Sequence, residues 1–161
     1  MNYAKKKQMP RKKVAIKNYT SEINAATSIS KIEHFLSSAG ATDISKSYAN
    51  NECVAIRFRI VVDEIPRFFE LPAKVEAVYN IFMSQKVKKN DPIVKQAAAE
   101  QARRTAWKII SDWVEIQITM IKMEQAEVAQ VFLPYAYDPQ SDTTLYERIK
   151  KGGYKLLTNS Q

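Results

Sequence analysis

The feature that most limits the fold of this chain is a long stretch without glycine or proline. Residues 93–133 contain neither, and apolar side chains recur there at helical spacing. They form two adjacent stripes: Ala102, Ala106, Ile109, Trp113, Ile116, Met120 and Met123, and beside them Trp107, Ile110, Val114, Ile118 and Ile121. So broad an apolar face is typical of a helix that neighbouring elements cover, which places Trp107 and Trp113 among the core candidates.

The length of this stretch sets a second limit. About 40 helical residues would span about 60 Å, which exceeds the width of a compact domain of 161 residues. The helix is therefore expected to bend, to break, or to project and pair with a second copy, and a homodimer is one expectation. Residues 133–139 should run extended, because Pro134 and Pro139 exclude the residues before them from helical geometry.

The first half of the chain has the period of β-strands. Residues 54–62 alternate apolar side chains with Ala55, Arg57, Arg59 and Val61, as in a strand with one face toward the core. Residues 49–52 and 63–64 have turn composition, and a further strand is expected at 65–71. A weaker alternation predicts another strand within residues 15–23.

Capping signals mark the other helices. One helix should begin at Thr27 or Ser28 and end at Gly40. A second should have Pro72 in its first turn and lysines 86–89 at its carboxyl end, where positive charge is favourable. The Asp91-Pro92 pair should open the long helix, and residues 145–151 should form a short last helix that begins with a capping box and stops at two glycines.

These patterns predict an α+β fold. An antiparallel sheet of three to five strands lies in the N-terminal half and packs against helices, and one long central helix lies in the C-terminal half. The expected order is strand, helix, three strands and then helices. The domain boundaries are an arm at 1–17, a single domain at 18–157 and a short tail at 158–161.

The positive charge lies mostly in the arm. Of the net charge of +8, residues 1–17 contribute +7, from Lys5, Lys6, Lys7, Arg11, Lys12, Lys13 and Lys17, and the remainder contributes +1. So polar a segment is expected to be disordered. It has three interpretations: a contact for nucleic-acid phosphates, a solubilising or targeting tail, or a segment introduced for protein production.

Two weaker basic patches lie outside the arm. Arg57, Arg59 and Arg67 accompany Phe68 on the predicted sheet, a combination that single-strand binders use. The alternative is that Arg57 or Arg59 pairs across the sheet with Glu70. The second of these patches combines Arg103, Arg104 and Lys108 on the long helix, although Glu100 is an ordinary partner for Arg104.

The sequence argues against an enzyme and predicts no cofactor and no metal. His34 and Cys53 are the only residues of their types, so neither a Cys/His metal site nor a well-supported triad is expected. Three glycines cannot build a phosphate-cradling loop. A carboxylate metal site could come from Asp112 with Glu115 or from Glu124 with Glu127, but such pairs on a helix are more typical of solvated charge than of a metal site.

Tyr135 and Tyr137 either present an aromatic contact surface or pack back on the sheet.

The single cysteine and the absence of a long apolar run predict an intracellular, reducing compartment, the cytoplasm, and no membrane partner.

Several segments resemble a family of small uncharacterised phage and prophage proteins. They are residues 102–108 (Ala-Arg-Arg-Thr-Ala-Trp-Lys), 112–117 (Asp-Trp-Val-Glu-Ile-Gln), 132–135 (Phe-Leu-Pro-Tyr), 144–147 (Thr-Leu-Tyr-Glu) and 71–73 (Leu-Pro-Ala). The resemblance covers roughly residues 18–157. It implies a mobile-element context, and hence the cytoplasm of a bacterial host, and it transfers no site residues.

The leading hypothesis from the sequence is therefore a non-enzymatic protein associated with DNA or RNA, which contacts phosphates through its basic arm. The alternative is a protein-binding subunit or inhibitor that acts on a host or viral protein machine.

Overall fold

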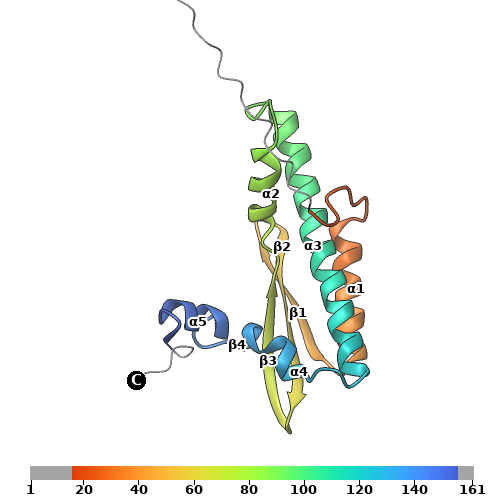
Figure 1. The fold of residues 1–161 in the computed structure, drawn as a ribbon, viewed down its shortest axis with the longest axis vertical. Helices are drawn as coiled ribbons and strands as arrows, with labels where there is room; N and C mark the ends of the chain where they lie inside the picture. Colours follow the sequence, from red (N-terminus) through yellow and green to blue (C-terminus); the bar gives the residue numbers. More distant parts are fainter. Residues whose placement is uncertain (1–15, 156–161) are drawn as a thin grey trace, which may run out of the picture.

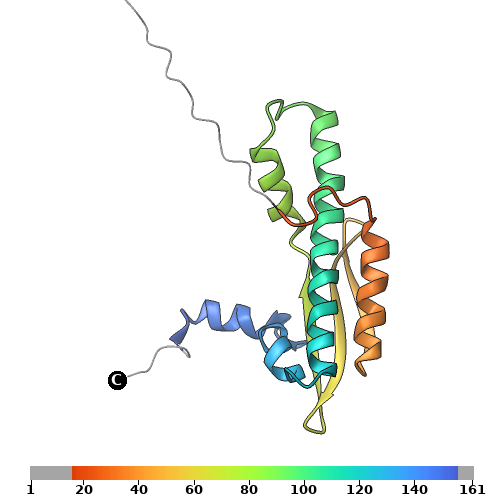
Figure 2. The same ribbon diagram turned by 45° about the vertical axis from the view of Figure 1, so that its right-hand side comes forward.

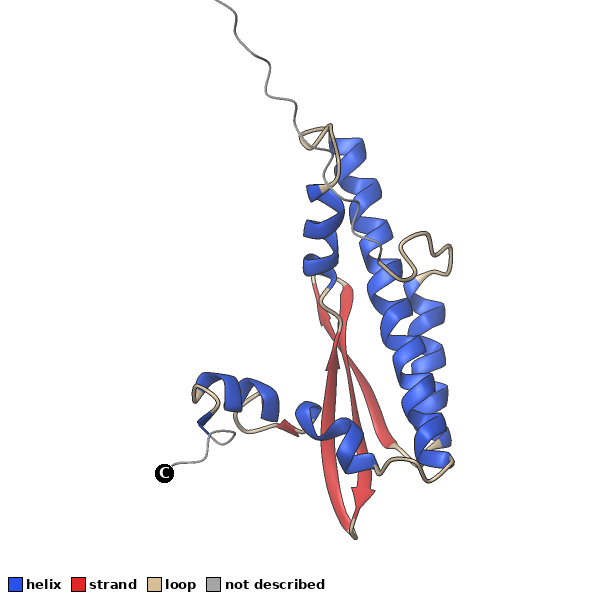
Figure 3. Cartoon of the chain, viewed as in Figure 1, coloured by secondary structure: helices blue, strands red, loops and turns tan. Residues whose placement is uncertain are grey.

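A computed structural model describes residues 16–155 and confirms the α+β class (Figure 1). Its three-stranded antiparallel sheet has the order β1-β2-β3, from β1 (Thr42–Ala49), β2 (Glu52–Val62) and β3 (Ile65–Pro72). Helices α1 (Ala25–Ser38) and α3 (Pro92–Lys122) lie side by side over one face of the sheet (Figure 3). Helix α2 (Val75–Ser84) runs beside α3 beyond the end of the sheet, so α1 and α2 flank α3 (Figure 2).

The chain after α3 turns back along the sheet. It forms α4 (Val128–Phe132), a 3-10 turn η1 (Leu133–Tyr135), and the short antiparallel pair β4 (Tyr137–Asp138) and β5 (Thr143–Thr144). The last helix, α5 (Leu145–Lys151), extends sideways from the body (Figures 1 and 2). Its capping box and its end at Gly152 are as predicted.

The two strand hairpins have the geometry that their turn residues favour. Asn50 and Asn51 have φ of 50° and 61°, and Asp63 and Glu64 have φ of 49° and 62°. Two consecutive residues with positive φ match the right-handed twist of the strands that they join. The resulting register fixes which β2 residues face the helices, and Ile56, Phe58 and Ile60 are buried there as the alternation predicted.

An aromatic cluster joins the sheet to α3 and α4. Phe132 of α4 is fully buried, with its ring centroid 5.4 Å from that of Phe58 in β2 and 5.7 Å from that of Trp113 in α3. Both pairs are edge-on, which suits the charge distribution of aromatic rings. Phe132 thus holds the returning chain against the core.

The long apolar stretch is a broken helix. Helix α3 ends at Lys122, Glu124 adopts a φ of 56°, and Gln125 N donates to Met120 O. A left-handed residue after the last turn is a common way for a helix to stop, although glycine or asparagine usually occupies that place. Of the three alternatives expected for this long stretch, the structure shows the break, and the break lets α4 return to the core.

The predicted strand within residues 15–23 is also absent from the described part of that range. Residues 17–20 form turns instead, with Tyr19 N donating to Ile16 O and with Asn18 at a φ of 64°. The N-cap of α1 is Asn24, whose side chain accepts from Thr27 N, and Ser28 lies buried inside the helix.

Two proline predictions also need correction. Pro72 ends β3 instead of opening a helix, because α2 begins only at Val75. Leu133–Tyr135 form the 3-10 turn η1 instead of running extended, since the buried Phe132 fixes where the chain leaves α4, whereas Tyr137–Asp138, just before Pro139, are extended in β4 as predicted. The β4–β5 pair was not predicted.

The aromatic cluster predicts an unequal effect of two adjacent substitutions. Phe132→Ala should lower the free energy of unfolding by about 3 to 5 kcal/mol, because it leaves a cavity among Phe58, Phe69 and Trp113. Leu133→Ala is the control, since Leu133 is 53% exposed and should change stability by about 0.5 kcal/mol or less. Urea unfolding of both variants measures the difference, and equal losses would contradict the packing described.

Candidate nucleic-acid interface

The first described residues cross α3 on the side away from the sheet. This anchor segment, residues 16–21, runs over α3 before entering α1 (Figure 2). Asn18 Nδ2 donates to Asp112 Oδ2 at 2.9 Å, and Thr105 Oγ1 donates to Asn18 O at 3.0 Å. Gln101 Nε2 donates to Tyr19 O at 2.9 Å. The chain that precedes residue 16 is therefore attached to the middle of α3.

Asp112 is the ionic centre of this attachment. Its carboxylate pairs with Lys108 one helical turn away and with Lys17 at 3.4 Å. Burial alone would raise the pKa of Asp112, but hydrogen bonds from Lys108 and Asn18 oppose it, and the pKa lies below its ordinary value. Lys17 and Lys108, both candidate phosphate contacts, therefore share one negative partner.

The two sheet arginines on β2 are occupied by partners within the fold. Arg57 Nε lies 2.5 Å from Glu70 Oε2, as the cross-strand alternative predicted, and a second nitrogen of Arg57 lies 3.0 Å from Asp142. Its guanidinium carbon also lies 4.4 Å from the ring centroid of Tyr137. Arg59 pairs with Asp43 at 2.6 Å. These contacts compete with any phosphate that approaches the sheet.

The remaining candidates differ in their surroundings. Arg103 forms a bidentate ion pair with Glu52 at the start of β2, in which two guanidinium nitrogens donate to the two carboxylate oxygens. Neither Arg67 nor Arg104 makes an ion pair or side-chain hydrogen bond with residues 16–155. The carboxylate of Glu100, the partner expected for Arg104, accepts from Gln96 instead at 3.5 Å. Lys5, Lys6, Lys7, Arg11, Lys12 and Lys13 lie outside the described residues.

A further basic group was missed by the sequence analysis. Lys86, Lys88, Lys89 and Lys95 surround the connection between α2 and α3, at the end of the molecule farthest from the β2–β3 turn (Figure 1). We call these four residues the lysine tip. The sequence signal was present in residues 86–89, but it was interpreted only as favourable charge at the end of a helix.

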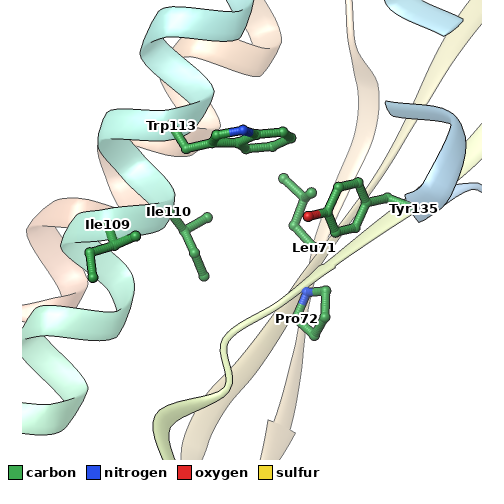
Figure 4. A pocket seen from close by; sticks show the side chains of 6 residues that line it. All are labelled: Leu71, Pro72, Ile109, Ile110, Trp113 and Tyr135. Carbon is green, nitrogen blue, oxygen red and sulfur yellow. The ribbon is translucent and has the colours of Figure 1, made fainter. Parts of the chain in front are cut away.

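A different kind of site lies between α3 and the end of β3. Leu71, Pro72, Ile109, Ile110, Trp113 and Tyr135 line a hollow of about 260 Å³ (Figure 4). The Trp113 and Tyr135 ring centroids are 5.5 Å apart, so Tyr135 packs back against the core. Because the lining is almost wholly apolar, the hollow suits an apolar side chain and not a charged cofactor.

The chemistry-bearing residues considered from the sequence are not brought together. His34 is exposed on α1, and burial raises the pKa of the Cys53 thiol, which disfavours the reactive thiolate. Among residues 16–155, no cluster of three or more histidine, cysteine or acidic side chains is placed to hold a metal ion. Within the same range, no helix has the length and apolar character needed to cross a membrane.

Comparisons with family models, curated proteins and solved structures found no match to this chain. The resemblance to phage proteins therefore stays a prediction.

The anchor segment predicts where the chain can be shortened without loss. Deleting residues 1–15 should leave the free energy of unfolding unchanged, because every anchor contact remains. Deleting residues 1–21 should lower it by about 1 to 3 kcal/mol, since Asp112, Thr105 and Gln101 lose their hydrogen bonds with the anchor segment. Chemical denaturation of the two truncated chains tests this, and equal stability would show that the anchor contributes nothing.

The lowered pKa of Asp112 predicts how stability depends on pH. A carboxyl whose pKa falls on folding stabilises the folded state above its unfolded pKa, near 3.8, and this contribution disappears as the pH falls through the folded value. Asp112→Asn should therefore be less stable than the parent chain at pH 7, and the gap should close in acid. Unfolding of both chains measured between pH 7 and 3 tests this, and a stability gap that stays constant over that range would contradict it.

Proposed function

We propose that this protein is a non-enzymatic, nucleic-acid-associated protein whose basic N-terminal segment contacts phosphates. The observation that carries the proposal is the anchor, which holds Asn18 and Tyr19 against the middle of α3 directly after a basic segment, residues 1–15. Those residues hold six lysines and arginines and no acid. A short segment of that composition supplies sequence-independent affinity for a phosphate backbone.

The charge of the described residues supports the same assignment. Residues 16–155 contain 19 basic and 17 acidic side chains, a net charge of only +2. Arg57, Arg59 and Arg103 are held in ion pairs within the fold. Arg104 has no such partner among the described residues, and it lies one turn before Lys108 on α3, close to the anchor. Arg104 thus adds positive charge, without an acidic partner among the described residues, beside the anchor that follows the basic segment.

This assignment predicts a strong dependence of binding on salt. Deleting residues 1–15 removes six positive side chains. For duplex DNA the slope of log affinity against log salt should therefore become shallower by up to about 5. Fluorescence anisotropy with labelled oligonucleotides of several sequences measures the slope, and the loss should be the same for all of them.

The matched control is Arg59→Gln, which changes an arginine already paired with Asp43 and should leave the slope nearly unchanged. Absence of binding to DNA and RNA by the full chain at about 150 mM salt would contradict the proposed function. A slope unaffected by the deletion would move the contact to the folded surface.

A second candidate function is binding to a protein partner, as a subunit or inhibitor of a host or viral machine. The observation that favours it is the apolar hollow beside Trp113 and Tyr135, which has the size and lining for an inserted apolar side chain. A pull-down from the native host, with and without nuclease, separates the two candidates. A partner that resists nuclease and is lost in Ile110→Glu, but kept after deletion of residues 1–15, would favour this function.

A further inference from the structure

The lysine tip is a concentration of positive charge that the fold does not use. None of its four lysines makes an ion pair or side-chain hydrogen bond with residues 16–155. The only acid between residues 85 and 96 is Asp91, and its carboxylate accepts from Ile93 N at 2.9 Å as the N-cap of α3. The tip therefore has four positive side chains and one negative side chain with a structural role.

Helix capping does not account for these lysines. Positive charge beyond Ser84 is favourable for the carboxyl end of α2, but the amino end of α3, which carries the opposite partial charge, begins at Pro92 in the same connection. The two helix ends thus have opposing effects on a lysine placed between them. Stability of the fold gives no reason to gather four lysines there, whereas an external anion does.

The charge is also polarised along the molecule. The opposite end contains the β2–β3 turn, with Asp63 and Glu64, and the segment after α3, with Glu124 and Glu127 (Figure 1). These four acids make no ion pair with residues 16–155. Arg67 in β3 and Lys122 at the end of α3 offset part of this negative charge, and the excess of acids remains at that end, so a polyanion would be attracted more strongly to the α2–α3 end.

We propose that the lysine tip is a second phosphate-binding site, which contacts the backbone of the same nucleic acid as the N-terminal segment. This inference rests on the proposed function. Lysine ammonium groups serve as point charges for phosphates, and the partial positive charge at the start of α3 adds to them. Lys95 and Gln101, which holds the anchor, are six residues apart on one helix, or about 9 Å along its axis.

The shared helix makes the two contacts act together. When one is bound, the other is held close to the same strand, so each raises the effective concentration of phosphate at the other. The rival ligand is an anionic membrane surface, because Val87 is 98% exposed and Ile93 is 78% exposed among the lysines. Nucleic acid is favoured because only these two exposed apolar side chains lie among the lysines for insertion into a membrane, whereas the tip has four lysines and a net charge of +3.

The test compares two triple variants of the full chain with equal loss of charge. Lys86→Gln/Lys88→Gln/Lys89→Gln alters the tip, and Arg148→Gln/Lys150→Gln/Lys151→Gln alters α5, which is also exposed and basic. Both should fold normally, as thermal melts will show, because the changed residues are not buried. Affinity for duplex DNA, duplex RNA and single-stranded DNA of equal length is measured over a range of salt concentrations.

The tip variant should make the salt slope for duplex DNA shallower by about 2 to 3, and the α5 variant should leave it unchanged. An unchanged slope in the tip variant, or equal changes in both variants, overturns the inference while the effect of deleting residues 1–15 still supports the proposed function. Failure of the full chain to bind any of the nucleic acids overturns both. Binding to phosphatidylserine vesicles that depends on the tip, without an effect on nucleic acid, assigns the site to a membrane surface and overturns it as well.

Discussion

The packing of α3 against its neighbours is the constraint on which the other parts of this structure depend. Its buried residues include Trp107 and Val114, which face a core shared with the sheet and α1. α2 packs along the same helix, Phe132 brings α4 onto Trp113, and Asp112 holds the anchor segment. Without α3 the sheet would lose its main cover, and α1, α2 and α4 would lose the helix on which they pack.

This arrangement fixes the position of the anchor segment, which follows residues 1–15 in the chain, relative to the lysine tip. The anchor segment and the lysine tip are both attached to α3, so their separation is set by the length of helix between them. A rigid spacing lowers the conformational entropy lost when two contacts form at once.

The sheet arginines have a structural role instead. Arg57 pairs across the strands with Glu70 and also contacts Asp142, which joins the β4–β5 segment to β2. The sheet arginines thus face acids within the fold, whereas the lysines of the tip are exposed.

Local patterns in the sequence predicted much of the fold for physical reasons. The alternation in β2 follows from a sheet with one buried face, and the capping box at Thr144 and Glu147 satisfies backbone groups within a single turn. The pairing of Arg57 with Glu70 was foreseen as an alternative, since it requires only a hairpin register. Such features depend on residues close in sequence or on one strand pairing.

The errors occurred where distant residues decide the structure. No glycine marks the end of α3, whose C-cap is Met123. The position of that end depends on the burial of Phe132, nine residues after the cap. Residues 16–20 turn instead of pairing as a strand because their partners, Gln101, Thr105 and Asp112, lie on α3. The lysine tip was overlooked because Lys95 joins the three earlier lysines only when the chain reverses between α2 and α3. Arg104 was paired with Glu100 by spacing alone, whereas that carboxylate accepts from Gln96.

The central claim is that the N-terminal segment and the lysine tip bind the phosphates of a nucleic acid. Lysine footprinting tests this claim most directly. The full chain is acetylated briefly with and without a saturating short DNA duplex, and the modification of each lysine is measured by mass spectrometry. Binding should protect Lys86, Lys88 and Lys89, together with the lysines of residues 1–15, and should leave Lys150 and Lys151 as reactive as before. Protection centred on α5, or equal protection of every exposed lysine, would contradict the account.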